Sequence, residues 1–231
     1  MSYTNGLDDP SAYFQATLYT GNGGTNAITN TGNSDLQPDW IWFKRRDGAD
    51  NHILFDVVRG VTKGIYSDLT NAEDNLADSL ASFNSDGFTL GADTGSGGSI
   101  NGSSETNVAW QWKAGEGQGS SNTDGSINTT YTSVNTTAGF SISKYTGNAT
   151  NGATVGHGLG AVPEMLIGKD LSDTSAWCVW HKDLTNAGYR LTLSTTAAQS
   201  DDTALFGGSS RTAPTSSVFT LGSGGGLNGA N

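Results

Sequence analysis

The feature that most constrains this chain is a long internal repeat. Phe14–Asn22 and Phe140–Asn148 are both alternating runs that end in Tyr-Thr-Gly-Asn. Further along, Leu36–Lys44 and Ala161–Lys169 share a proline, an acidic residue, an apolar run and a lysine. Alternating runs that end in turn residues are typical of β-strands. The repeat therefore predicts two copies of a strand-rich unit.

Two more segments extend the match in the same order. His52–Asp56 corresponds to Trp177–His181, and Phe83–Gly91 corresponds to Ser216–Gly222, with Asn-Gly following each of the last pair. The prolines of the two copies, at positions 38 and 163, are 163 − 38 = 125 residues apart. Solenoid repeats are much shorter, about 20 to 50 residues. The pattern therefore indicates a duplicated domain.

Short runs of Val, Ile, Trp, Phe, Tyr and Thr alternate with clusters of Gly, Asn, Asp and Ser along both copies. This pattern predicts an all-β chain of two tandem antiparallel β-sandwich domains, of a jelly-roll or lectin-like kind. We place the first unit at residues 1–115 and the second, related unit at residues 139–231. Residues 116–138 form a connection and the start of the second unit, and Gly115–Ser126 is expected to be flexible.

Helix is expected to be scarce. Asn71–Phe83 is the best candidate, because Leu76, Leu80 and Phe83 have helical spacing, and a short helix and an irregular loop fit it equally well. Asn107–Lys113 is expected to close the first unit as a strand, whereas the second stops at Asn231 before its counterpart. Either the native chain runs on, which we favour because an open sheet edge promotes aggregation, or a neighbouring chain supplies the strand.

Charge and composition exclude several partners. The formal net charge of −11 repels phosphate, so we expect no nucleic acid and no anionic membrane as partner. No run approaches the roughly 18 apolar residues of a membrane span, and the start, Met1–Gly6, lacks the features of a secretory signal. Cys178 is the only cysteine, which excludes an intrachain disulfide and a cysteine-based zinc site, and we expect a buried thiol.

Several segments together resemble a known group of proteins. They are Asp8–Gln15, Leu18–Gly23, Leu36–Trp42, Phe55–Gly60 and Val108–Gly115. Over nearly its whole length the chain is similar to repeated β-domain proteins of tailed bacteriophages, especially those of marine and cyanobacterial hosts. The resemblance implies a virion structural protein of tail, fibre or capsid exterior. The group has no established catalytic residues, so none are expected here. The shortened second copy departs from its pattern.

No candidate residue forms a recognised catalytic or metal-binding pattern. His52, His157 and His181 lie in different surroundings and are expected to be structural or surface residues. Gly156–Gly160 and the alternating glycines of Gly115–Gly119 look like phosphate-binding loops but lack the strand and helix that such loops need. Asn84–Gly87 and Asn122–Gly125 lack the bidentate glutamate of an EF-hand and are expected to be turns.

The six tryptophans and two of the asparagines allow both a structural and a functional interpretation. Each ring is expected to pack in a core, although an exposed ring beside Asn or Asp would stack on a sugar. The rings are Trp40, Trp42, Trp110, Trp112, Trp177 and Trp180. Asn101 and Asn128 begin glycosylation motifs but are expected to be turn residues in a protein made in bacteria.

Three functions remain open at this point. The first is a non-enzymatic virion subunit, made in the host cytoplasm, that assembles with other virion proteins and with copies of itself, a trimer being one arrangement, and that attaches to host-surface polysaccharide. The second is a lectin-like carbohydrate-binding module. The third is a polysaccharide-degrading enzyme, which needs two carboxylates about 5 to 10 Å apart in a groove. We expect no cofactor and no metal.

Overall fold

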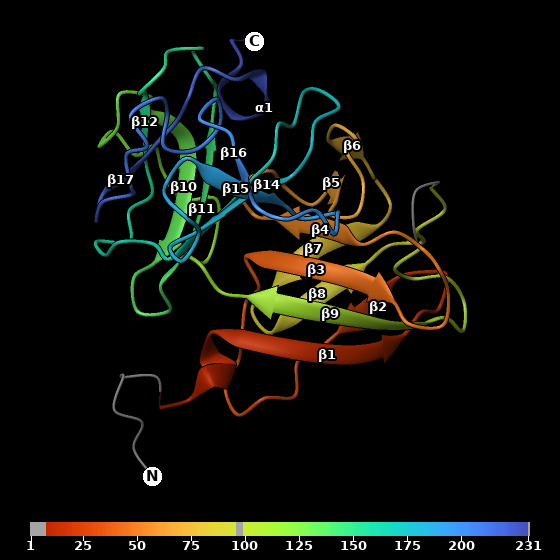
Figure 1. Ribbon diagram of the computed structural model, residues 1–231. Helices are drawn as coiled ribbons and strands as arrows, with labels where there is room; N and C mark the ends of the chain where they lie inside the picture. The colour runs from red at the N-terminus through yellow and green to blue at the C-terminus, as the bar shows by residue number, and fades with distance from the viewer. Residues whose placement is uncertain (1–7, 96–98, 231) are drawn as a thin grey trace. The chain divides into compact units, whose positions relative to one another are not determined.

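The computed structural model describes residues 8–95 and 99–230. Strands dominate it, and the described residues contain one 3-10 turn, Pro10–Ala12, and one short helix, α1, Gly225–Asn228. The all-β prediction is confirmed (Figure 1). The chain divides into two compact units, one of Met1–Ser67 with Glu73–Gln118 and the other of Asp68–Ala72 with Gly119–Asn231.

The first unit is a sandwich of two antiparallel sheets. Its larger sheet has the order β1-β9-β3-β4-β5-β6, and its smaller sheet has the order β2-β8-β7. The strands are β1 Phe14–Thr20, β2 Asn26–Ile28, β3 Trp40–Arg45, β4 Ile53–Asp56, β5 Lys63–Tyr66, β6 Asp74–Asn75, β7 Leu80–Asn84, β8 Gly87–Leu90 and β9 Thr106–Trp112. Figure 1 shows β9 between β1 and β3, so the expected closing strand lies inside the sheet.

The core of this unit lies between the two sheets. The ring centroids of Phe43 in β3 and Phe88 in β8 are 5.1 Å apart, and those of Phe43 and Phe55 in β4 are 6.1 Å apart. Large apolar side chains at alternate positions of β3 face inward because successive residues of a strand point to opposite faces. Ile41 and Phe43 are therefore fully buried, while Trp40 and Trp42 point to the other face.

The second unit uses nearly the same strand order. Its sheets have the orders β13-β14-β15-β16, β12-β17 and β10-β11. The strands are β10 Thr129–Asn135, β11 Phe140–Tyr145, β12 Thr154–Gly156, β13 Met165–Gly168, β14 Cys178–His181, β15 Tyr189–Thr192, β16 Ser200–Asp201 and β17 Val218–Thr220. The order β3-β4-β5-β6 thus recurs as β13-β14-β15-β16, and β2-β8 recurs as β12-β17. This unit has its own apolar core, which includes Val155, Phe206, Phe219 and Leu221.

Two local predictions were wrong. Asn71–Phe83 forms neither a helix nor an irregular loop throughout, because it contains β6 and most of β7. Gly115–Ser126 is not a flexible connection along its length, since Ser120 and Thr132 exchange backbone hydrogen bonds of 3.3 and 2.7 Å. Small polar residues order here through backbone bonds, which leave no apolar pattern in a sequence.

Candidate functional site

The same polar anchor holds one end of each unit together. In the first unit the side chain of Asn101 accepts from the Asn22 amide at 3.1 Å and donates to the carbonyls of Gly24 and Gly91 at 2.7 and 2.6 Å. Asn101 lies in a bend, as predicted for a turn residue, and it is fully buried. An amide side chain donates twice and accepts through its oxygen, which suits it to tying three backbone segments together.

Asn228 repeats this arrangement in the second unit. It accepts from the Asn148 amide at 2.9 Å and donates to the carbonyls of Thr150 and Gly222 at 2.9 and 2.6 Å. The tyrosines of the repeated Tyr-Thr-Gly-Asn runs match as well, because Tyr19 donates to the Ile100 carbonyl and Tyr145 to the Leu227 carbonyl. These are the contacts that a duplicated module predicts.

Backbone amides of the Gly115–Gly119 loop do surround an anion, but the anion is the protein's own Asp39. Its carboxylate accepts from the amides of Ala114, Glu116 and Gly117 at 2.6, 2.9 and 2.9 Å. Burial raises the pKa of Asp39, and the three amide hydrogen bonds oppose that rise. The loop is therefore a structural clasp on the chain that leaves β9, and no phosphate is needed to explain it.

The three histidines have different surroundings. His157 is buried, contacts the Thr215 carbonyl at 3.2 Å, and has its pKa lowered by burial. His52 accepts a 3.0 Å hydrogen bond from the indole of Trp42, and His181 lies 3.6 Å from the Asp183 carboxylate at the surface. Among the described residues, no group of three or more His, Cys, Asp or Glu side chains could hold a metal ion.

The remaining candidates have structural places. Gly156 ends β12, which pairs with β17 and leads into no helix. Asn84–Gly87 forms the turn between β7 and β8, and Asn122 accepts from the Asp124 amide at 2.9 Å, so both segments are turns as predicted. Cys178 is buried as predicted, and burial raises the pKa of its thiol to about 11.

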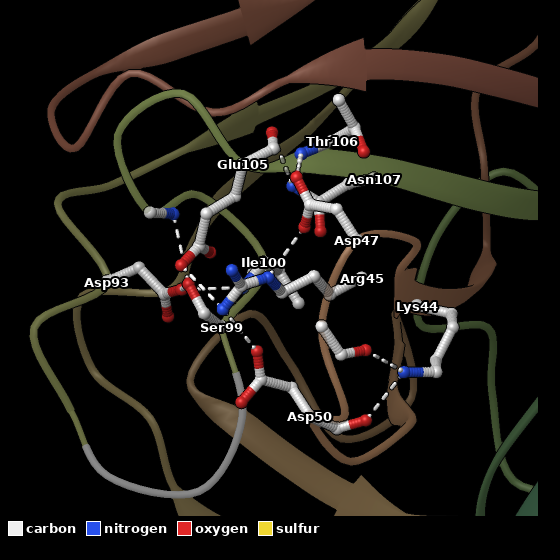
Figure 2. Close-up of polar contacts among 12 residues, drawn as sticks. Lys44, Arg45, Asp47, Asp50, Asp93, Ser99, Ile100, Glu105, Thr106 and Asn107 are labelled. Carbon is white, nitrogen blue, oxygen red and sulfur yellow. Dashed lines mark hydrogen bonds and ion pairs between the residues drawn. The ribbon is translucent and has the colours of Figure 1, made fainter.

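Charged side chains cluster where β3 ends beside the start of β9 (Figure 2). Arg45 contacts the carboxylates of Asp47, Asp50 and Glu105 at 2.7, 2.9 and 2.8 Å. The hydrogen bond from Arg45 lowers the pKa of Asp47 to about 2. A general acid of a glycosidase needs the opposite shift, so this cluster has the character of a brace that fixes the strand ends.

The most distinctive surface of the first unit is the outer face of its large sheet. Phe14, Trp112 and Trp40 stand opposite one another on three adjacent strands, with centroid distances of 4.9 Å and 4.6 Å. Trp110 and Trp42 form the next row at 6.3 Å. We call these five residues the aromatic face. All four of its tryptophans are partly exposed, so core packing was predicted wrongly for them.

Trp177 and Trp180 behave differently, because both are 5% exposed and pack as predicted. The sequence showed the alternation of Trp40 with Trp42 and of Trp110 with Trp112. It did not show that β9 brings the two pairs onto one face, since this requires the order of strands. The alternation within each pair was the only sign of such a face in the sequence, because rings two positions apart on a strand point to the same side.

Comparison with known proteins identifies the family of the chain and little more. A family model described as a domain of unknown function (DUF7483) matches residues 9–231. No curated protein and no solved structure matches the chain. In the described part of the chain, no helix has the length and apolar character required to cross a membrane.

Proposed function

We propose that this chain, which belongs to the DUF7483 family, is a structural subunit of a bacteriophage virion, in the tail, a fibre or the capsid exterior. It works without catalysis, by forming interfaces with copies of itself and with other virion proteins. The observation that carries the proposal is the aromatic face.

A surface of this kind favours association. Phe14 is 40% exposed and Leu18, on the same face of β1, is 61% exposed. Contiguous exposed apolar side chains mark interaction sites, and tryptophan is enriched among the residues that contribute most to binding. Burial of such rings between proteins stabilises an interface by removing apolar area from water.

Charge supports the same use of this face. Copies that each carry a formal net charge of −11 repel one another. The outward positions of β1, β9 and β3 include Phe14, Trp110 and Trp42 and carry no acidic residue, Lys44 being the one charged side chain among them. An assembly contact through this face therefore avoids the strongest repulsion.

Sedimentation of the purified chain tests the proposal. We expect the native protein to self-associate in a concentration-dependent way, and the double variant Trp42→Ala, Trp110→Ala to sediment as a monomer with an unchanged circular dichroism spectrum. Val162→Ser, which removes a 57% exposed apolar side chain outside the aromatic face, is the matched control and should associate like the native protein.

The proposed place of the chain on the phage particle needs a second measurement. An antibody against this chain should decorate purified phage particles at a fixed position. Absence of the chain from purified particles, together with a monomeric native protein at all concentrations, would contradict the proposal.

A lectin-like function is the second candidate, because exposed indole rings also stack on sugars. It predicts that host-surface polysaccharide quenches or shifts the tryptophan fluorescence of the native protein. The Trp42→Ala, Trp110→Ala variant should lose that response. Polysaccharide binding by a protein that never self-associates would favour the lectin function over the assembly function.

A further inference from the structure

We infer that His157 is an acid-sensitive latch of the second unit. While its ring is neutral, the latch holds the loop of residues 156–160 against Thr215–Ser217, the segment before β17, and it releases that loop when the ring is protonated. The contacts of the two ring nitrogens carry the inference. It is independent of the aromatic face and of the assembly role proposed above, since every group involved belongs to the second unit.

His157 lies where three segments of the second unit meet. It follows β12 directly, and its amide extends the pairing of β12 with β17 by donating to the Ser217 carbonyl at 3.1 Å. Its carbonyl accepts from the Ser141 hydroxyl of β11 at 2.6 Å. The residue is 3% exposed. A rearrangement of its ring therefore disturbs the contacts of β11, of β12 and of the segment before β17.

The partners of the ring assign its neutral form and its tautomer. Nδ1 lies 3.2 Å from the Leu159 amide nitrogen, which can only donate, so Nδ1 accepts and carries no proton. Nε2 lies 3.2 Å from the Thr215 carbonyl oxygen, which can only accept, so Nε2 carries the proton. Both ring nitrogens are thus used, one as an acceptor and the other as a donor.

Protonation of the ring is incompatible with these contacts. In the imidazolium both ring nitrogens are donors, so the new N–H at Nδ1 would point at the N–H of Leu159. Gly158, which joins the two residues, has a φ of +71° and packs against Val134 of β10. A buried charge that has lost a hydrogen bond is costly, and the cost is relieved when the ring turns into water. That movement also breaks the bond to Thr215.

The surroundings of the ring favour its neutral form. Burial lowers the pKa of His157, and the Thr215 carbonyl and the Asp124 carboxylate oppose this fall. The folded protein therefore binds the proton less readily than an unfolded chain, in which histidine titrates near pH 6.5. The latch contributes stability above pH 6.5, and that stability is lost as the pH falls through the lowered pKa.

The elements packed around the ring bring few other titratable side chains to it, as far as the described residues extend. Lys144 of β11 and Tyr131 of β10 lie on the faces of these strands opposite to Ser141 and Val134, because neighbouring residues of a strand point to opposite faces. Residues 215–217 have only hydroxyl side chains. Burial and the Asp124 carboxylate therefore govern the titration of the ring.

The first unit has a residue without a proton equilibrium at this place. The register of β2 with β8 and of β12 with β17, together with the Phe-Thr-Leu run that both units share, makes Asn30 the counterpart of His157. Asn30 is also buried, and its side chain donates to the Leu36 carbonyl at 3.2 Å. An amide side chain gains no proton in mild acid. The latch is therefore a property of the second unit.

A nuclear magnetic resonance titration of the full native chain tests the latch. At neutral pH we expect the His157 ring to be the Nε2–H tautomer, and we expect it to titrate below pH 6.5. With the same midpoint, the protection of the Leu159 amide, corrected for the pH dependence of intrinsic exchange, should fall at least about tenfold. The Trp42 amide of the first unit should keep its protection over the same range.

Two variants separate the ring from other effects of acid. The side chain of His157→Gln can still donate to the Thr215 carbonyl but has no proton equilibrium, so Leu159 should stay protected in acid. His181→Gln is the matched control, because Nδ1 of His181 also accepts from an amide two positions on, that of Asp183 at 3.2 Å, but at the surface. It should leave the acid response of Leu159 unchanged.

Three results would overturn the inference. The first is protection of Leu159 that persists after the His157 ring is charged, and the second is a ring that stays neutral until the whole unit unfolds. The third is an acid response of Leu159 that survives in His157→Gln, since another group would then cause it. The native protein alone gives the first two results, so the test stands even if His157→Gln does not fold. None of them bears on sedimentation of the aromatic-face variant.

Discussion

The two units share their rim and differ at the centre of the large sheet. Asn101 and Asn228 tie equivalent turns with equivalent hydrogen bonds, and β13-β14-β15-β16 repeats β3-β4-β5-β6. Between these common parts the first unit holds β9 and the second holds a groove. The comparison teaches that the rim contacts and the apolar core form without the central strand.

The largest expected difference between the units is the effect of a proline at equivalent positions of β3 and β13. The Trp42 amide faces β9 inside the sheet, so Trp42→Pro should lower the free energy of unfolding by about 3 kcal/mol or more. Ile167→Pro lies on an open edge and should cost less than about 1 kcal/mol. Urea unfolding measures both, with Trp42→Ala as the control for loss of the ring. Equal costs would mean that both positions are paired.

A second difference between the units is the ion pair beneath β4. Arg59 bonds to the Asp56 carboxylate at 2.6 Å with both side chains buried, and its counterpart in the repeat is Leu184. Arg59→Met should destabilise the first unit by about 3 kcal/mol, because it leaves a buried carboxylate without its partner. The double variant with Asp56→Leu should recover much of that loss in thermal unfolding. A single variant within 1 kcal/mol of the native protein would contradict the role of the pair.

The asparagine anchors, Asn101 and Asn228, test what the two units share. Asn101→Ala and Asn228→Ala should each cost about 2 to 3 kcal/mol, since each strands buried backbone carbonyls that have lost their donors. The two losses should be similar because the bonds are equivalent. If the units unfold in separate steps, each variant should shift one step only. A large loss of stability in Asn101→Ala with none in Asn228→Ala would show that the hydrogen bonds of Asn228 do not stabilise the second unit.

The smallest expected effect is on the stability of the protein at acid pH. Arg45 lowers the pKa of Asp47 to about 2 in the folded protein, below its ordinary value of 3.8. A depressed pKa contributes stability that is present above pH 4 and is lost as the pH falls through 2. The native protein should therefore exceed Asp47→Asn in stability at pH 6, and the difference should shrink between pH 4 and pH 2. Asp183→Asn, which removes an exposed carboxylate of the second unit without touching Arg45, is the control.

The residue pattern predicted much of this fold. Alternation in Phe14–Asn22 and Phe140–Asn148 placed β1 and β11, and the segment Asn107–Lys113 correctly predicted β9. Strand order was beyond reach, because pairing partners far apart in the chain leave no local pattern. For this reason the four outward tryptophans were assigned to a core. The same limit hid the role of Asp39, whose three amide donors lie 75 to 78 positions away.

The missing counterpart of Asn107–Lys113 was noted from the sequence. Which edges of β11 and β13 carry no strand within residues 119–230 required the structure, because the order of strands leaves no local pattern in a sequence. Duplication of one ancestral module remains the hypothesis that explains both the shared rim and the shared sequence pattern.

The most direct measurement is the exchange rate of two backbone amides in the native protein alone, compared by nuclear magnetic resonance. At Trp42 we expect slow exchange, limited by opening of the sheet, whereas at Ile167 we expect exchange close to that of an exposed amide. Equally slow exchange at both positions would contradict the account, because it would mean that the second unit already has its central strand.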